Sequence, residues 1–144
     1  AWECHQDFGY WYHNGCLSPE MLSVFIALDA SNKANGCLQV LKGSHILGRL
    51  DHIREDGQTN VDKPYLNAAV ERFEHVYVEM EAGDALVFHS NLLHRSDANT
   101  SDTYRWGYIC SYNAVHNAPF KRERDYGNYE ELRTVPAGSF LKAS

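Results

Sequence analysis

The sequence predicts a mainly β domain that folds as a sandwich or a closed barrel. Short segments rich in β-branched and large apolar residues recur along the chain, turn residues separate them at regular intervals, and no alternation of strands with long helices is seen. The 144 residues, of which 44% are apolar, suffice for one substantial core. Because no repeat or linker divides the chain, we expect a single domain over residues 1–144.

Five segments have the composition of strands. Met21–Asp29 is almost continuously apolar, Gly36–Leu41 alternates before a turn at 42–45, and His75–Glu81 alternates strictly, so that Val76, Val78 and Met80 share one face. In chain order the expected strands are 21–29, 36–41, 75–81, 85–89 and 104–112.

The other segments are less regular. Tyr65–Phe73 is the one plausible short helix, whereas residues 46–64 are polar and irregular and are expected to form a lid or an insertion. The tail from residue 113 to 144 mixes Pro, Gly and charges without a clear period.

Charge and composition exclude several classes of partner. The net charge is -6 and the basic residues are scattered, so we expect neither nucleic acid nor an anionic membrane as a partner. No apolar run reaches the roughly 20 residues that span a bilayer. The four cysteines lack the spacing of a zinc knuckle and are expected to be free thiols in the cytoplasm or another reducing compartment.

The first dozen residues contain a possible metal-binding pair. In a strand, residues two apart project from the same face, so His5 and Asp7 would aim an imidazole and a carboxylate at one point. An H-x-D triplet occurs often by chance, and a third ligand is therefore required. The segment 86–96 supplies two candidates, His89 and His94.

Two histidines and one carboxylate leave three positions of an octahedron open, which is the arrangement of non-haem iron(II) oxygenases. Zinc more often recruits cysteine or a third histidine and keeps one open position. The donor set favours iron and leaves zinc as an alternative.

The chain resembles the phytanoyl-CoA dioxygenase family, which includes the ectoine hydroxylases. The matching motifs appear in the family's order and are spread over most of residues 2 to 112, with Arg105 eleven positions after His94. They are Trp2-Glu3-Cys4-His5-Gln6-Asp7, Gly36-Cys37-Leu38-Gln39-Val40, Gly43-Ser44-His45, residues 83–89 and Leu93-His94-Arg95-Ser96.

The resemblance implies that His5, Asp7 and His94 bind iron(II), while Arg105 and Ser96 bind the distal carboxylate of the co-substrate 2-oxoglutarate. An arginine fork meets a carboxylate with two hydrogen bonds, and a serine hydroxyl adds another. An extended backbone would turn Ser96 to the same side as His94.

Two tryptophans occupy positions where the related ectoine hydroxylases carry aromatic residues. Trp11 would lie against the co-substrate and Trp2 would form another wall of the site, although either is equally compatible with an ordinary core position.

The other histidines are expected to be structural. His89 lacks the Ser and Arg partners at the family spacing, and His45 lies in a Gly-Ser-His turn that the family shares. His13, His52, His75 and His116 are expected at the surface or as hydrogen-bonded core residues.

The resemblance also implies the fold and the reaction. The fold would be a double-stranded β-helix, the jelly-roll barrel of cupin-like oxygenases. Family members carry helices and at least one barrel strand upstream of the H-x-D motif, and this chain begins without Met four residues before His5. We therefore expect a fragment whose barrel is incomplete at the N-terminus.

The expected activity is hydroxylation of a C–H bond in a small molecule, with O2 as oxidant and with release of succinate and CO2. Related halogenases lack the carboxylate ligand, so Asp7 favours hydroxylation. Two alternatives stay open: a zinc or manganese cupin acting as an isomerase or hydrolase, and a non-catalytic jelly-roll binding module. The sequence does not identify the substrate.

Overall fold

The computed structural model describes residues 1–55, 57–121, 130–133 and 135–138 of the chain. Strands form most of its regular structure, so the prediction of a mainly β domain is confirmed. In chain order the elements are β1 (Trp2–His5), α1 (Asp7–His13), β2 (Met21–Ala27), β3 (Leu38–Lys42), η1 (Ser44–Leu47), β4 (His52–Glu55), β5 (Gln58–Val61), α2 (Lys63–Val70), β6 (Glu74–Tyr77), β7 (Ala85–His89), β8 (His94–Ser96), β9 (Gly107–Asn113) and η2 (Val115–Asn117).

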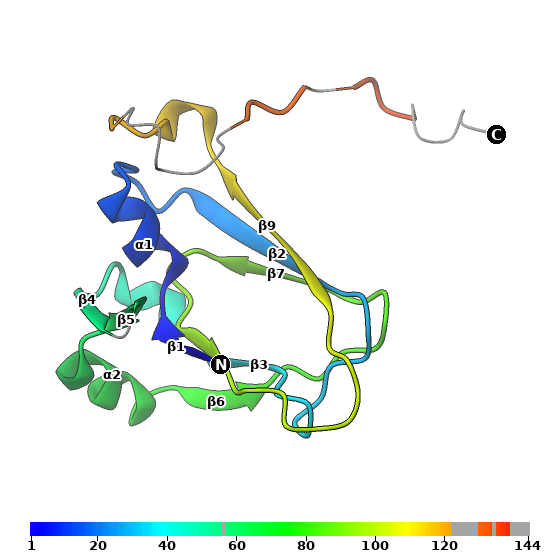
Figure 1. Ribbon diagram of the computed structural model, residues 1–144. Helices are drawn as coiled ribbons and strands as arrows, with labels where there is room; N and C mark the ends of the chain where they lie inside the picture. The colour runs from blue at the N-terminus through cyan, green and yellow to red at the C-terminus, as the bar shows by residue number, and fades with distance from the viewer. Residues whose placement is uncertain (56, 122–129, 134, 139–144) are drawn as a thin grey trace.

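Two antiparallel sheets form separate layers (Figure 1). The first sheet has the strand order β1-β8-β3-β6, and the second has the order β7-β2-β9. Strands β4 and β5 form a separate hairpin, which lies with α2 beside the first sheet. Almost every neighbouring pair is far apart in sequence, so the sheets bring together residues from both ends of the described chain.

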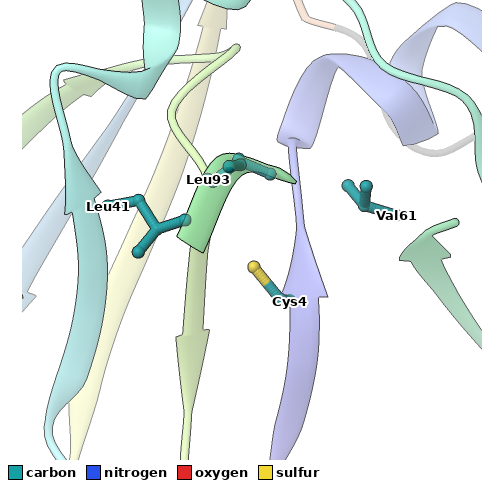
Figure 2. Close-up of a cluster of buried hydrophobic side chains, with 5 residues drawn as sticks. Cys4, Leu41, Val61 and Leu93 are labelled. Atoms are coloured by element: carbon teal, nitrogen blue, oxygen red, sulfur yellow. The ribbon is translucent and has the colours of Figure 1, made fainter. Parts of the chain in front are cut away.

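A hydrophobic cluster supports the first sheet. Its buried members are Cys4, Leu41, Val61, Ala69 and Leu93, which come from β1, β3, β5, α2 and the residue before β8. Figure 2 shows Cys4 and Leu41 on either side of the segment that carries Leu93. The hairpin and α2 thus cover one face of this sheet, and the opposite face is left for the site described below.

The structure corrects several expected boundaries. Residues 46–64 are not irregular, because 52–55 and 58–61 pair as a hairpin whose turn includes Gly57 at φ 78°. The helix begins at Lys63, two residues earlier than expected, with Pro64 in its first turn, where a missing N–H costs nothing. The last strand begins at Gly107, so Arg105 precedes β9 instead of lying within it.

The expectation that His5 and Asp7 share one strand is wrong. Strand β1 ends at His5, Gln6 is extended at φ -111° and ψ 133°, and Asp7 is the first residue of helix α1. No side-chain cap marks the start of this helix. Tertiary contacts hold it instead, since Phe8 is buried and its N–H donates to the Ser90 carbonyl at 2.9 Å.

All four cysteines are free, as expected, and Cys4, Cys16 and Cys37 are buried. Burial raises the pKa of the Cys4 thiol to about 11. In the part of the chain that the structure describes, no helix is both long and apolar enough to cross a membrane.

Candidate metal centre

His5, Asp7 and His94 converge between the two sheets. One potential ligand atom from each lies within 4.8 Å of the others. Strands β1 and β8 pair so that His5 stands directly opposite His94, and the ring centroids are 4.2 Å apart. Asp7 Oδ1 is 3.6 Å from His5 Nε2 and 3.4 Å from His94 Nε2. The three groups therefore face one point.

Backbone hydrogen bonds fix which ring nitrogens face that point. His5 Nδ1 lies 2.7 Å from the Glu3 carbonyl, and His94 Nδ1 lies 2.9 Å from the Leu92 carbonyl. Since a carbonyl only accepts hydrogen bonds, both Nδ1 atoms carry a proton. In the neutral rings Nε2 then keeps its lone pair, which is the form of histidine that binds a metal.

The carboxylate is held in its ionised form. Burial acts to raise the pKa of Asp7, but hydrogen bonds from His5, His94 and Ser23 outweigh burial and hold the pKa well below its ordinary range. Burial acts to lower the pKa of His5, but the hydrogen bond to Asp7 and the Glu3 carbonyl raise it above its ordinary value. Both directions reflect the attraction between the anionic Asp7 carboxylate and the protonated form of His5.

Gln6, between the two ligands, ties them to distant loops. Its side chain has no exposed surface. Its amide nitrogen donates to the Gly48 carbonyl at 2.7 Å and to the Asn91 carbonyl at 2.8 Å, and its oxygen accepts the Leu50 N–H at 2.8 Å. One amide thereby joins the H-x-D turn to the loop before β4 and to the loop that leads to His94.

His52 supports the same turn. Its Nε2 accepts the backbone N–H of Gln6 at 3.0 Å, and its Nδ1 donates to the Leu50 carbonyl at 2.8 Å. The ring packs so closely on α1 that any side chain at Gly9 would collide with it. The sequence alone predicts for His52 only a surface position or a hydrogen-bonded core position. No sequence signal linked His52 to Gln6, because the contact spans 46 positions.

The two predicted co-substrate residues lie in different surroundings. Ser96 is buried, like His94, while Arg95 between them is only half-buried, so Ser96 is on the face of β8 that carries the ligand. Arg105 is half-buried, and its Nε donates to the Asn35 carbonyl at 3.0 Å. Among the described residues the terminal nitrogens of Arg105 have no hydrogen-bond partner.

The two tryptophans differ in burial. Trp11 is partly buried against the apolar cluster of Phe8, Cys16 and Met21. Trp2 stands opposite Ser96 in the β1–β8 pairing and is 63% exposed. An irregularity in β1 between residues 2 and 5 puts Trp2 on the same face as His5, although simple alternation would put them on opposite faces.

The remaining histidines lie outside the cluster. His89 ends β7, is exposed, and its Nδ1 accepts the Asn91 N–H at 3.0 Å, with the exposed His45 ring 5.8 Å away. His75 bonds the Gln39 side chain, and His116 bonds Glu20. His13 is exposed. His94, and not His89, therefore belongs to the cluster with His5 and Asp7.

The residues present fit an iron(II) ion. Two neutral imidazole nitrogens and one carboxylate oxygen form the donor set typical of non-haem iron sites. Phe88 from β7 packs against the His94 ring at 4.9 Å between centroids and supplies an apolar wall. None of the four cysteines belongs to the cluster.

Comparisons with known proteins find relatives among named hydroxylases and dioxygenases. The family model for phytanoyl-CoA dioxygenase (PhyH) matches residues 1–107. L-proline trans-4-hydroxylase of Streptomyces griseoviridis is 29% identical over 136 residues, which cover 83% of this chain and 50% of that protein. Phytanoyl-CoA dioxygenase of Arabidopsis thaliana is 34% identical over 106 residues, which cover 72% of this chain and 35% of that protein. The chain spans half or less of the length of these relatives.

Solved structures of EctD from S. alaskensis have the same fold. The structure with 2-oxoglutarate and 5-hydroxyectoine gives a TM-score of 0.70 at 27% identity and covers 82% of this chain and 40% of that one. The structure with bound Fe gives a TM-score of 0.69 at 26% identity and covers 90% of this chain and 43% of that one. This similarity confirms the predicted jelly-roll fold.

Proposed function

The chain belongs to the phytanoyl-CoA dioxygenase family, and from that premise we propose that it forms the core of an iron(II)- and 2-oxoglutarate-dependent dioxygenase that hydroxylates a small molecule. The observation that carries the proposal is the convergence of His5, Asp7 and His94, whose ligand atoms lie within 4.8 Å of one another. EctD, which shares the fold, was crystallised with Fe and with 2-oxoglutarate.

The chain's own residues would prepare the site. His5 and His94 would present Nε2 to the metal, because their Nδ1 protons are engaged by the backbone, and Asp7 would supply an anionic oxygen. Gln6 and His52 would hold the turn between these ligands. When bound, iron(II) supplies redox chemistry with O2 in which 2-oxoglutarate becomes succinate and CO2 and a substrate C–H bond is hydroxylated.

Ser96 and Arg105 would bind the distal carboxylate of 2-oxoglutarate. Ser96 is buried on the ligand-bearing face of β8. Arg105 already donates Nε to the Asn35 carbonyl, which would hold the side chain while its terminal nitrogens meet a carboxylate. Trp2, on the same face as Ser96, and Trp11, one helical turn after Asp7, would border the site.

The substrate is proposed to be a small molecule. Relatives are named for L-proline and ectoine, whereas others are named for phytanoyl-CoA. Because Asp7 would supply a carboxylate as the third protein ligand, which the related halogenases lack, a hydroxylase is proposed in preference to a halogenase.

The direct test is 2-oxoglutarate-dependent succinate formation by the full-length protein with iron(II), ascorbate and O2. Asp7→Ala and His94→Ala should reduce succinate formation at least about 100-fold, because each removes a ligand. His89→Ala is the matched control, since it removes a nearby histidine outside the cluster, and it should retain activity.

The alternatives predict different results. Stoichiometric zinc or manganese with no response to 2-oxoglutarate would favour a cupin isomerase or hydrolase. Equal metal content in wild type and His94→Ala would favour a binding module without a metal centre, and either result would refute the proposal.

A further inference from the structure

Ser23 reaches the metal centre from the second sheet. It lies in the middle of β2, is 1% exposed, and is the only polar residue of that strand. Its hydroxyl is hydrogen-bonded to Asp7 Oδ2. The other carboxylate oxygen, Oδ1, is the one that faces His5 and His94. The two oxygens of Asp7 therefore have separate partners from separate parts of the fold.

We propose that Ser23 is a positioning residue that holds Asp7 as a one-oxygen metal ligand, with Oδ1 toward the metal and Oδ2 kept by the serine. This inference rests on the proposed function, because it assumes that the cluster binds a metal. It assigns a task to a residue that no motif of the family resemblance includes.

The donor and the acceptor in each of these hydrogen bonds follow from the protons that are available. An ionised carboxylate only accepts, so Ser23 donates its single hydroxyl proton to Asp7. Ser111 in β9 stands directly opposite Ser23, with its Oγ 3.3 Å from that of Ser23. Since the Ser23 proton is already used, Ser111 is the donor in this second contact. Two hydroxyls thus point in series toward Oδ2.

This arrangement matters for the number of open metal positions. A carboxylate binds a metal through one or both oxygens. With one oxygen, the two histidines and Asp7 leave three of six positions for the co-substrate and O2. With both oxygens, only two positions stay open. A charge-assisted hydrogen bond on Oδ2, about twice as strong as a neutral one, opposes the second mode.

The test uses Co(II) as a probe in place of iron(II), with the full-length protein made metal-free. Co(II) affinity is measured by titration, and the visible d–d absorption of the bound ion reports its coordination number. Ser23→Ala should weaken Co(II) binding by about 10- to 100-fold and change the absorption spectrum, as expected when a residue that orients a ligand is lost. Ser23→Thr retains the hydroxyl and should restore both.

Ser90→Ala is the matched control. Ser90 is also 1% exposed, and its hydroxyl donates to the Pro19 carbonyl at 3.0 Å and not to a ligand. Its backbone carbonyl, which accepts the Phe8 N–H, is retained in the alanine variant. This variant should leave both Co(II) affinity and spectrum unchanged. If Ser23→Ala fails to fold in thermal unfolding of the metal-free protein, the exposed Ser111→Ala decides, with a few-fold loss of Co(II) affinity expected.

Two outcomes are separable. Wild-type affinity and spectrum in Ser23→Ala, or in Ser111→Ala where that variant decides, would overturn the role of Ser23 and leave the metal centre intact. Failure of the wild-type protein to bind Co(II), together with no succinate formation, would overturn the proposed function itself and this inference with it.

Discussion

The two sheets differ in what covers their outer faces. The sheet β1-β8-β3-β6 is packed by α2 and the β4–β5 hairpin, and its cluster includes Leu93 with no exposed surface. The outer face of β7-β2-β9 also carries apolar and aromatic side chains, but Val87 and Tyr108 on it are 61% and 58% exposed. Among the described residues, no element packs on that face.

The site is divided between these two sheets. The sheet β1-β8-β3-β6, whose outer face is covered, is the packed layer, and β7-β2-β9 is the bare layer. Both histidines come from the packed sheet, and the turn that carries Asp7 is held by Gln6 and His52 on the same side. The bare sheet contributes Ser23 and the Phe88 wall. The ligand geometry therefore depends mainly on the packed layer, and substitutions in the two layers test the contrast between them.

The largest effect is expected from Leu93→Ala. It removes a fully buried side chain next to His94 and should lower the free energy of unfolding by about 2–5 kcal/mol, because a cavity is left behind. Leu22→Ala is the same substitution on the bare sheet, where Leu22 is 38% exposed, and it should cost about 1 kcal/mol or less. Urea unfolding measures both, and equal losses would refute the contrast between the layers.

The second-largest effect is expected from Gln6→Leu. It leaves the Leu50 N–H and the carbonyls of Gly48 and Asn91 buried without their partner, at a cost of about 2–3 kcal/mol. Metal affinity should fall as well, because the turn between His5 and Asp7 loses its anchor. Thermal unfolding and Co(II) titration measure the two effects. A stable variant with normal affinity would show that the hydrogen bonds of Gln6 do not organise the turn.

His52 should make the free energy of unfolding decrease at acidic pH. Burial lowers the pKa of His52, and the positive charges of His5, Arg49 and His13 act in the same direction. The stabilisation that the neutral His52 ring contributes is present above the ordinary histidine pKa of about 6.5. It is lost as the pH falls from there through the lower pKa of His52 in the folded state. His52→Gln keeps an acceptor but does not titrate.

The measurement is the free energy of unfolding of the metal-free protein by urea, from neutral to mildly acidic pH. The decline in His52→Gln should be shallower than in wild type. His13→Gln removes only the smallest of the three charges that act on His52, so it should stay close to the wild type. Parallel curves for wild type and His52→Gln would contradict the prediction.

The smallest effect is expected from Val87→Thr on the bare sheet. Thr retains the β-branched shape and strand preference, and Val87 is 61% exposed, so the free energy of unfolding should change by less than about 0.5 kcal/mol. A loss above about 1 kcal/mol in urea unfolding would show that this face is packed in the whole protein.

Much of the fold and the centre of the site follows from local patterns. Strand β7 has the expected bounds, and β2 begins where expected, because these segments are strongly apolar and bounded by turn residues. The sequence does not predict the β4–β5 hairpin, because six of the eight strand residues are polar and Val61 is the only buried one, so there is no hydrophobic alternation. Helix α1 escaped because it lacks a capping side chain.

The sequence by itself determined the class of fold and the candidate ligands, since His5, Asp7, His94, Ser96 and Arg105 stand at a specific order and spacing along the chain. Only the tertiary structure decided how those residues are held. Gln6, His52 and Ser23 reach their partners across 85, 46 and 16 positions, and each contact depends on where separate strands and loops pack. The order and spacing of residues in the sequence show which side chains are available for a site. Hydrogen bonds between distant segments form only once the chain has folded.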